Sequence, residues 1–342
     1  MKIKVLGVDN CIKEIQQILE NARSNAYRAV NFEMVKAYWE IGKVIVEEEQ
    51  KGEKRAEYGL ALINDLSVKL TKEYGKGFTE RNLRNMRAFY DSFPKWHALR
   101  AELTWTHYRL LLKIETESAR HFYLNETINS NWSTRELDRQ INSLLYERLA
   151  LSKDKKGVLE LAERGQIVKN PEDLIKDPYV LEFLNLKENS KFQEKDVESL
   201  LIYNLKQFLL ELGKGFSFVS RQKRITVDGD HYYIDLVFYN YYLKCFVLID
   251  LKIGKLTHKD IGQMDFYVRY FEKEVKHSDD YPTIGLILCS DKSKTMVKYT
   301  LLNDSNQIFA SKYKLYLPTE KELKEEIEKK REQIKISKKL GD

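Results

Sequence analysis

Hydrophobic positions follow two different periodicities along this chain. From about residue 10 to residue 149, apolar residues recur every three or four positions with only Pro94 between them, a spacing typical of amphipathic helices. Beyond Gly215 the apolar residues gather instead in short runs rich in β-branched and aromatic side chains, which predict strands. These runs are RQKRITV, YYIDLVF, CFVLIDL, TIGLILC and KLYL, with a helical segment over 259–271 between the third and the fourth. We therefore expect a helical N-terminal domain followed by an α/β domain with a mixed central sheet.

Composition marks the expected domain boundaries. Residues 151–177 are rich in Lys, Asp and Glu and contain Pro171, as junctions between domains often are. We expect a helical, DNA-binding domain over 1–155, a linker over 156–175 and the α/β domain over 176–320. The remaining residues, 321–342, are dense in Lys and Glu and predict a charged helix or tail.

Composition also excludes several classes of protein. The net charge of +6 over 342 residues permits an anionic partner without demanding one. Three widely spaced cysteines argue against a disulfide framework or a thiolate zinc site, and they favour a reducing compartment. The sequence shows neither an apolar run of ~20 residues nor a secretory signal, so we expect a cytoplasmic protein with no membrane association.

Two carboxylates are expected to meet on neighbouring strands. The runs 232–238 and 245–251 are close enough to form an antiparallel hairpin. A four-residue loop over 241–244 would pair Asn240 with Cys245 and place Asp235 opposite Asp250, with Lys252 on the same face. Opposed like charges destabilise a sheet, and a bridging cation such as Mg²⁺ or Mn²⁺ would remove that cost. The alternative, equally open from spacing alone, is a salt-bridge cluster on a solvated strand.

These residues resemble a known nuclease pattern. Asp235 followed by Asp250-Leu251-Lys252 is similar to the PD-(D/E)XK superfamily, and the segment QMDFY at 263–267 looks like its Q-x-x-x-Y motif. The blocks YWEIGKVIVEEE, GFTERNLRNMRAFY, LTWTHYRLLL, WSTRELDRQI and IDLKIG…GQM resemble in particular the bacterial YhcG-type family over nearly the whole chain. Many relatives carry Glu where this chain has Asp250.

The resemblance implies a restriction-endonuclease-like α/β domain that hydrolyses phosphodiesters with Mg²⁺ or Mn²⁺. It implies that Asp235 and Asp250 hold the metal, that Lys252 assists the attacking water, and that Gln263 and Tyr267 belong to the catalytic set. Such families often add a Glu from the preceding helix. On the helix expected over 194–212, Glu198 lies on the apolar stripe of Ile202, Leu205 and Leu209, and Glu211 lies far around from it, so we prefer Glu198.

Candidate nucleic-acid contacts fall in both halves of the chain. Arg221 and Gln222, on the first expected strand, are candidates for phosphate contact, with a strand-edge charge as the alternative. In the helical half, the segments 58–74 and 80–91, with Thr79 as the cap of the second, predict a helix–turn–helix-like pair. The second helix would bury Leu83, Met86 and Tyr90. It would present its basic residues and one amide to a DNA groove, namely Arg81, Arg84, Asn85 and Arg87, unless this is merely the solvated face of a bundle.

Together these observations favour a Mg²⁺- or Mn²⁺-dependent endodeoxyribonuclease targeted by its helical domain. The expected partner is DNA, duplex or branched, and a homodimer is compatible with the sequence. Two alternatives remain open: a DNA-binding protein whose nuclease domain serves only as a scaffold, and an RNA nuclease, since the fold's chemistry does not distinguish the sugars.

Overall fold

The computed structural model describes residues 8–51, 56–95, 99–150, 155–186, 192–291, 307–319 and 321–322. By its internal contacts the chain divides into two compact units, Met1–Leu137 and Asp138–Asp342. The charged helix or tail expected over 321–342 lies outside the described residues apart from Lys321 and Glu322. No helix among the described residues is both long and apolar enough to cross a membrane.

The first unit is helical, as its periodicity predicted. Its elements are α1 (Val8–Lys51), α2 (Ala56–Tyr74), a 3₁₀ turn η1 (Lys76–Phe78), α3 (Glu80–Ser92), α4 (Trp105–Leu111), α5 (Glu117–Asn129) and the start of α6 (Thr134–Asn142). Ile45, Ile63, Leu83 and Met86 form a core where α1, α2 and α3 meet. Gly42 lets α1 approach α3 closely, because a Cβ there would lie 2.1 Å from the Met86 carbonyl oxygen.

The helix–turn–helix-like pair forms as expected, with one change in its buried face. Thr79 caps α3 by accepting a hydrogen bond from the Asn82 amide (3.4 Å). Phe89, rather than Tyr90, is the third fully buried residue of α3 after Leu83 and Met86. The reason is aromatic packing, since the Phe89 ring lies 4.6 Å from that of Tyr108 on α4.

The second unit contains a six-stranded mixed sheet of order β1-β6-β5-β4-β3-β2. Strand β3 pairs antiparallel with both β2 and β4, whereas β4, β5, β6 and β1 pair in parallel. The strands are β1 (Tyr179–Val180), β2 (Phe216–Val227), β3 (Asp230–Asn240), β4 (Cys245–Lys255), β5 (Ile284–Asp291) and β6 (Ile308–Lys314). The strand expected at 314–317 thus lies earlier in the chain, because Ile308 and Tyr313 supply its buried side chains.

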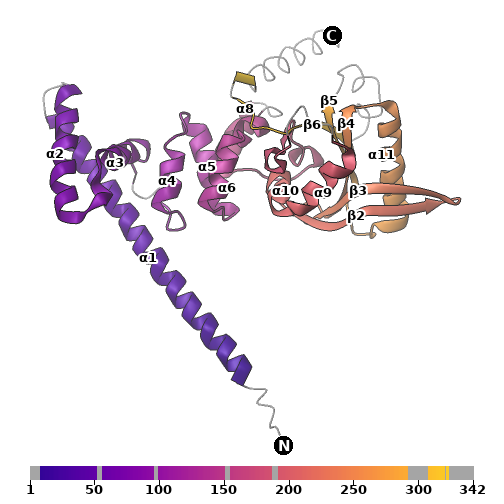
Figure 1. The fold of residues 1–342 in the computed structure, drawn as a ribbon, viewed down its shortest axis with the longest axis horizontal. Coiled ribbons are helices and arrows are strands. Elements are labelled where there is room, and N and C mark those ends of the chain that lie inside the picture. The colour runs from indigo at the N-terminus through magenta and orange to yellow at the C-terminus, as the bar shows by residue number, and fades with distance from the viewer. Residues whose placement is uncertain are drawn as a thin grey trace, which may run out of the picture. The chain divides into compact units, whose positions relative to one another are not determined.

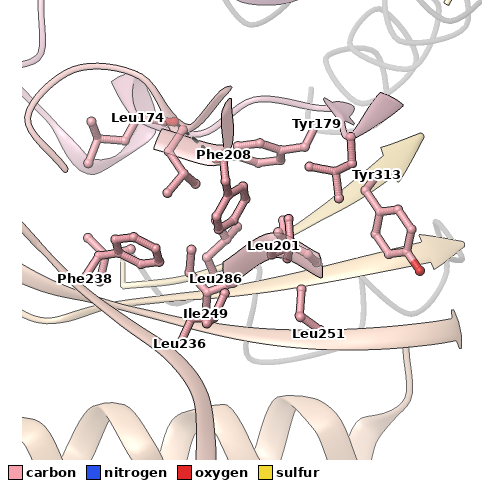
Figure 2. Packing of buried hydrophobic residues seen from close by; sticks show 14 of the residues in the cluster. Leu174, Tyr179, Leu201, Phe208, Leu236, Phe238, Ile249, Leu251, Leu286 and Tyr313 are labelled. Atoms are coloured by element: carbon pink, nitrogen blue, oxygen red, sulfur yellow. Dashed lines mark hydrogen bonds between the residues drawn. The ribbon is translucent and has the colours of Figure 1, made fainter. Parts of the chain in front are cut away.

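Helices cover both faces of this sheet. The helical elements are the rest of α6, α7 (Leu145–Ala150), α8 (Lys155–Arg164), η3 (Pro171–Asp173), η4 (Glu182–Leu184), α9 (Glu194–Tyr203), α10 (Leu205–Leu212), α11 (His258–Tyr270) and the π-helical turn η5 (Phe271–Val275). Leu201 and Phe208, from α9 and α10, pack with Leu236, Ile249 and Leu286 of the sheet (Figure 2). On the other face α11 packs against a second cluster. The expected α/β architecture is confirmed.

The structure begins its second unit earlier than the boundary expected near residue 155. Arg139 of α6 and Arg148 of α7 both bond to Glu211 of α10, which joins these helices to the sheet's unit. Residues 156–175 are likewise not a free linker, because α8 and the buried Leu174 belong to the same unit.

Candidate active site

The β3–β4 hairpin has the predicted register. A four-residue turn over 241–244 sets Asn240 opposite Cys245, and pairing continues to Leu236 opposite Ile249. One residue further the backbone ladder stops, and the Asp235 carboxylate instead accepts a hydrogen bond from the Leu251 amide (2.8 Å, to Oδ2). Asp235 therefore stands where β3 parts from β4, next to Asp250.

Asp250 is buried beside a single cation. Its side chain is 2% exposed, and Lys252 Nζ lies 2.9 Å from its Oδ2 atom. Burial, together with the neighbouring Asp235 carboxylate, raises the pKa of Asp250 to about 7, although Lys252 acts in the opposite direction. For Lys252, burial by itself would lower the pKa, but Asp250 outweighs that effect and raises it, so the ammonium keeps its charge.

A third carboxylate reaches this place from α9. Glu198 is 3% exposed, and its Oε2 atom accepts a hydrogen bond from Gln222 Nε2 at 2.7 Å. The same Gln222 amide also donates to Asp235 Oδ1 at 3.0 Å, so it bridges the two carboxylates. Burial raises the pKa of Glu198, and the Asp235 charge adds to that effect, whereas the Gln222 hydrogen bond opposes it.

Gln222 occupies an unusual backbone conformation for a strand residue. Its φ is 46°, in the left-handed region that non-glycine residues seldom adopt. Such strain costs roughly 1–3 kcal/mol and collects at functional sites. The Gln222 side-chain amide donates to the carboxylates of Glu198 and Asp235, whereas the sequence had made it a candidate for contact with a phosphate. Arg221 remains half exposed, with its Nε atom 3.4 Å from Glu198 Oε1.

Glu211 is not part of this cluster. The helix expected over 194–212 breaks at Asn204, whose ψ of 33° is not helical, and the break changes the direction in which the following turn faces. Glu211 is therefore buried, although the sequence placed it away from the apolar stripe of the helix. Its carboxylate contacts Arg148 and Arg139, and not Asp235 or Asp250.

Gln263 and Tyr267 support the site from α11. Gln263 Nε2 donates to the Tyr267 hydroxyl, which in turn donates to the Tyr233 carbonyl oxygen at 2.8 Å. Tyr267 is fully buried, and burial raises its pKa. In this arrangement the pair holds β3 two residues before Asp235, so both act as positioning residues.

Glu194 also contacts the site, although the sequence did not predict it. Its Oε1 atom accepts a hydrogen bond from the Ile253 amide at 3.0 Å, and its Oε2 atom lies 3.7 Å from Lys252 Nζ. It is therefore a second carboxylate partner of Lys252, after Asp250. The available signal was its spacing, because Glu194 precedes Glu198 by one helical turn and so shares its face.

The donor chemistry suits a hard divalent cation. Asp250 Oδ2 and Glu198 Oε1 are buried, and each lies against one cationic side chain, Lys252 at 2.9 Å and Arg221 at 3.4 Å respectively. Carboxylate oxygens are the ligands that Mg²⁺ and Mn²⁺ prefer. No three acidic, His or Cys side chains in the described ranges are grouped closely enough to hold a metal as they stand. The Gln222 amide, placed between Glu198 and Asp235, accounts for that separation.

The basic residues of α3 are partly occupied by ion pairs. Arg84 pairs with Glu80 at 2.7 Å, and Arg87 pairs with Glu49 of α1 at 2.6 Å. Arg81 is exposed and Asn85 is half-buried. The residues predicted to contact DNA thus lie outside the buried face of α3, with two of the three arginines engaged by carboxylates.

Comparison with known proteins agrees with this geometry. Residues 172–328 match the family model described as YhcG PDDEXK nuclease domain, and residues 14–148 match the DUF1016 N-terminal domain. The chain is 39% identical over 345 residues to the protein named “Putative nuclease YhcG” of Escherichia coli (strain K12), covering 92% of each chain.

Two solved structures show a weaker likeness. One is described as a repair endonuclease from Pyrococcus abyssi, with 19% identity, a TM-score of 0.27 and coverage of 39% of this chain and 50% of that one. The other is EndoMS in its apo form, with 15% identity, a TM-score of 0.25 and coverage of 38% and 49%. The chain spans about half the length of these two structures, and at such TM-scores neither bears on its substrate.

The match over 92% of the Escherichia coli protein and the two consecutive domain matches agree with the carboxylate–lysine site at the point where the pairing of β3 with β4 ends. The chain belongs to the YhcG family, whose second domain is a PD-(D/E)XK nuclease domain.

Proposed function

We propose that this protein is a DNA endonuclease that depends on Mg²⁺ or Mn²⁺. The observation that carries the proposal is Asp250, a buried carboxylate that neighbours the Asp235 carboxylate and has Lys252 as its one cationic partner, in a chain of a nuclease family. A salt-bridge cluster on a solvated strand, the other interpretation of these residues, would not bury Asp250 to 2% exposure.

Asp235 and Asp250 are the residues that would hold the cation, with Glu198 as the third donor. Nucleases of this class generally use divalent metals, and the bound metal polarises the phosphate and lowers the pKa of a water molecule. Asp235 accepts hydrogen bonds from the Leu251 amide at Oδ2 and from Gln222 at Oδ1, and these two bonds hold its carboxylate in place. Glu198 would join Asp235 and Asp250 once its hydrogen bond with the Gln222 amide is broken.

Lys252 supplies a fixed positive charge beside the attacked phosphate. Because its pKa is raised, it remains protonated at neutral pH and stabilises developing negative charge rather than removing a proton. Its Nζ atom has two carboxylate partners, Asp250 and Glu194. Gln263 and Tyr267 contribute indirectly, by fixing the backbone of β3.

The helical unit is proposed to target the nuclease to DNA. Arg81, Arg84, Asn85 and Arg87 lie on the surface of α3 beyond its buried Leu83, Met86 and Phe89. The ion pairs of Arg84 and Arg87 are exposed, and such pairs are worth only ~0–1 kcal/mol, so phosphates can replace their carboxylates. Replacing Arg81 and Arg84 with Ala should weaken DNA binding and reduce its salt dependence.

Cleavage assays with the purified full chain test the catalytic proposal. Plasmid DNA, branched DNA and RNA would each be incubated with Mg²⁺, Mn²⁺ or excess EDTA. We expect DNA cleavage with metal only, and we expect Asp250→Asn and Lys252→Ala to abolish it while DNA affinity stays within about three-fold, less than ~0.7 kcal/mol.

Matched controls separate the site from general damage to the domain. Asp265→Asn removes a carboxylate paired with the exposed Arg269, and Lys255→Ala removes an exposed lysine near the end of β4; both should cleave normally. Cleavage in excess EDTA, or an active Asp250→Asn protein, would refute the metal site. Cleavage of RNA alone would replace DNA as the substrate.

A further inference from the structure

The β2–β3 hairpin continues beyond the active site as a two-stranded arm. Pairing of β3 with β4 ends at Leu236, but pairing of β3 with β2 continues out to Val227 opposite Asp230. Figure 1 shows β2 and β3 running on together past the other strands. Residues 221–234, here named the arm, therefore begin at the catalytic carboxylates and lead away from them.

One side of the arm is fixed to α11. Ile225 and Ile234 are fully buried in the cluster that α11 covers. The Tyr232 ring lies 4.8 Å from that of Phe266, and the Tyr267 hydroxyl holds the Tyr233 carbonyl. These contacts order the arm, so side chains on its free side are presented in a defined place.

The free side of the arm is basic and aromatic. Arg224 is exposed on this side, and Tyr233, directly opposite it, is 45% exposed. Lys223 is also exposed, but it pairs with Ile234 and therefore lies on the side of the arm that faces α11. Within the described part of the chain, neither cation pairs with a carboxylate. The arm's acidic residues away from the site, Asp228 and Asp230, stand at its tip, so positive charge is concentrated at the end nearest the active site.

We propose that the arm binds the nucleic-acid strand flanking the cleaved bond, with Arg224 on a phosphate and Tyr233 stacked on an unpaired base. This inference rests on the proposed function. Tyr233 precedes Asp235 by two strand residues, roughly 7 Å, so a strand whose phosphodiester lies at Asp235 continues along the arm. An unpaired cation on an ordered ribbon complements a phosphate, and an exposed aromatic ring beside it offers a platform for a base.

The aromatic platform also defines a substrate class. A base stacked within a duplex has both of its faces covered by neighbouring bases, so Tyr233 can stack only on a base that has left the helix. The favoured substrate is therefore DNA with unpaired nucleotides beside the cleavage site, such as a fork, flap or junction, over a continuous duplex.

Binding measurements with full-length Asp250→Asn protein test the arm without cleavage. The probes are one fluorescent sequence as single strand, duplex and fork, titrated over a range of salt concentrations. Tyr233→Ala should raise the dissociation constant for single strand and fork by about five-fold or more, with much less effect on the duplex. Arg224→Ala should weaken binding to all three probes and should lower the salt slope by about 0.7–0.9.

The controls are exposed residues of the same unit away from the arm. Tyr281→Ala and Lys273→Ala should leave every affinity and slope unchanged. Equal affinities for the Tyr233→Ala protein and its parent on all probes would overturn the stacking contact, and an unchanged salt slope for the Arg224 variant would overturn the phosphate contact. Wild-type cleavage of DNA distinguishes failure of the arm, in which cleavage persists, from failure of the nuclease proposal, in which it is absent.

Discussion

Two buried carboxylates in the second unit differ in what surrounds them. Glu211 is 0% exposed and lies against three cationic side chains. Arg148 and Arg139 contact its carboxylate at 2.5 Å and 3.2 Å, and the Lys176 ammonium donates to the backbone carbonyl oxygen of Glu211. Asp250 is 2% exposed and has one cation, Lys252, with a second carboxylate at its other side. Burial is nearly equal for the two groups, so the difference lies in their partners.

Their pKa values move in opposite directions for this reason. Burial would raise the pKa of Glu211, but Arg148, Lys176 and Arg139 outweigh it and lower the pKa to about 2. Burial raises the pKa of Asp250 to about 7, because Lys252 cannot offset both burial and Asp235. A carboxylate saturated by cations is part of the scaffold, whereas one left short of partners is available to a ligand.

The largest expected effect is on the scaffold carboxylate. Glu211→Gln leaves Arg148 buried without its counter-ion, and breaking such a pair costs ~3–5 kcal/mol. Urea unfolding should show this loss. The double variant Glu211→Gln/Arg148→Met should recover part of it, and a Glu211→Gln protein as stable as the wild type would refute the comparison.

The second-largest effect is expected from acid, which should remove the folding stability that Glu211 contributes. Its pKa is lowered from an ordinary value of 4.5 to about 2, so its stabilisation is present above pH 4.5 and is lost as the pH falls toward 2. With ~1.4 kcal/mol per pKa unit, the full loss approaches about 3 kcal/mol. Unfolding free energies at several pH values should converge for wild type and Glu211→Gln as the pH falls; parallel curves would contradict the pKa.

Metal should act on Asp250 and not on Glu211. At 100 times its dissociation constant, Mn²⁺ should stabilise the wild type by about 2.7 kcal/mol, which raises the melting temperature by about 2–4 °C per kcal/mol. Asp250→Asn should show a much smaller rise. Glu211→Gln should melt lower but keep the full metal-induced rise, and the loss of that rise would show that the two sites are coupled.

Changing the bridge at Gln222 tests how the metal-free carboxylates are held together. Gln222→Glu replaces the amide that donates to Glu198 and Asp235 with a third negative charge. Without metal the variant should lose about 1–3 kcal/mol, the usual cost of leaving such groups unsatisfied. Mn²⁺ should restore more stability to it than to the wild type. Gln222→Asn, which tolerates the left-handed backbone, serves as the conservative control.

Asp250→Asn in EDTA should produce the smallest change. It removes repulsion of roughly 0.2–1 kcal/mol between opposed carboxylates, so the metal-free variant should be as stable as the wild type or slightly more stable. Lys252 still has Glu194 at 3.7 Å, which limits what it loses. Thermal melting in EDTA measures this difference, and a loss above about 1 kcal/mol would mean that Asp250 serves the scaffold as Glu211 does.

The local parts of this site could be predicted from the sequence. The hairpin register followed from a four-residue turn between two apolar runs, because strand pairing counts outward from the turn. That register brought Asp235 next to Asp250. Glu198 was selected by helical spacing within a single helix, and the structure brings it to the same place through Gln222. Each of these inferences spans few residues and depends on a regular repeat.

Contacts between distant segments could not be predicted in this way. Arg148 and Glu211 are 63 residues apart in the sequence. The helix also breaks at Asn204, so the helical spacing counted from Glu198 no longer predicts which way Glu211 faces. Gln222 is a further case, because its side chain on β2 joins Glu198 of α9 to Asp235 of β3.

The sequence by itself determined the two kinds of domain, the strand register and the candidate acids, because these follow from periodicity and short-range geometry. Only the tertiary structure decided which buried carboxylate is saturated by cations and which is left open. Burial and charge partners come from segments that meet only after the chain has folded.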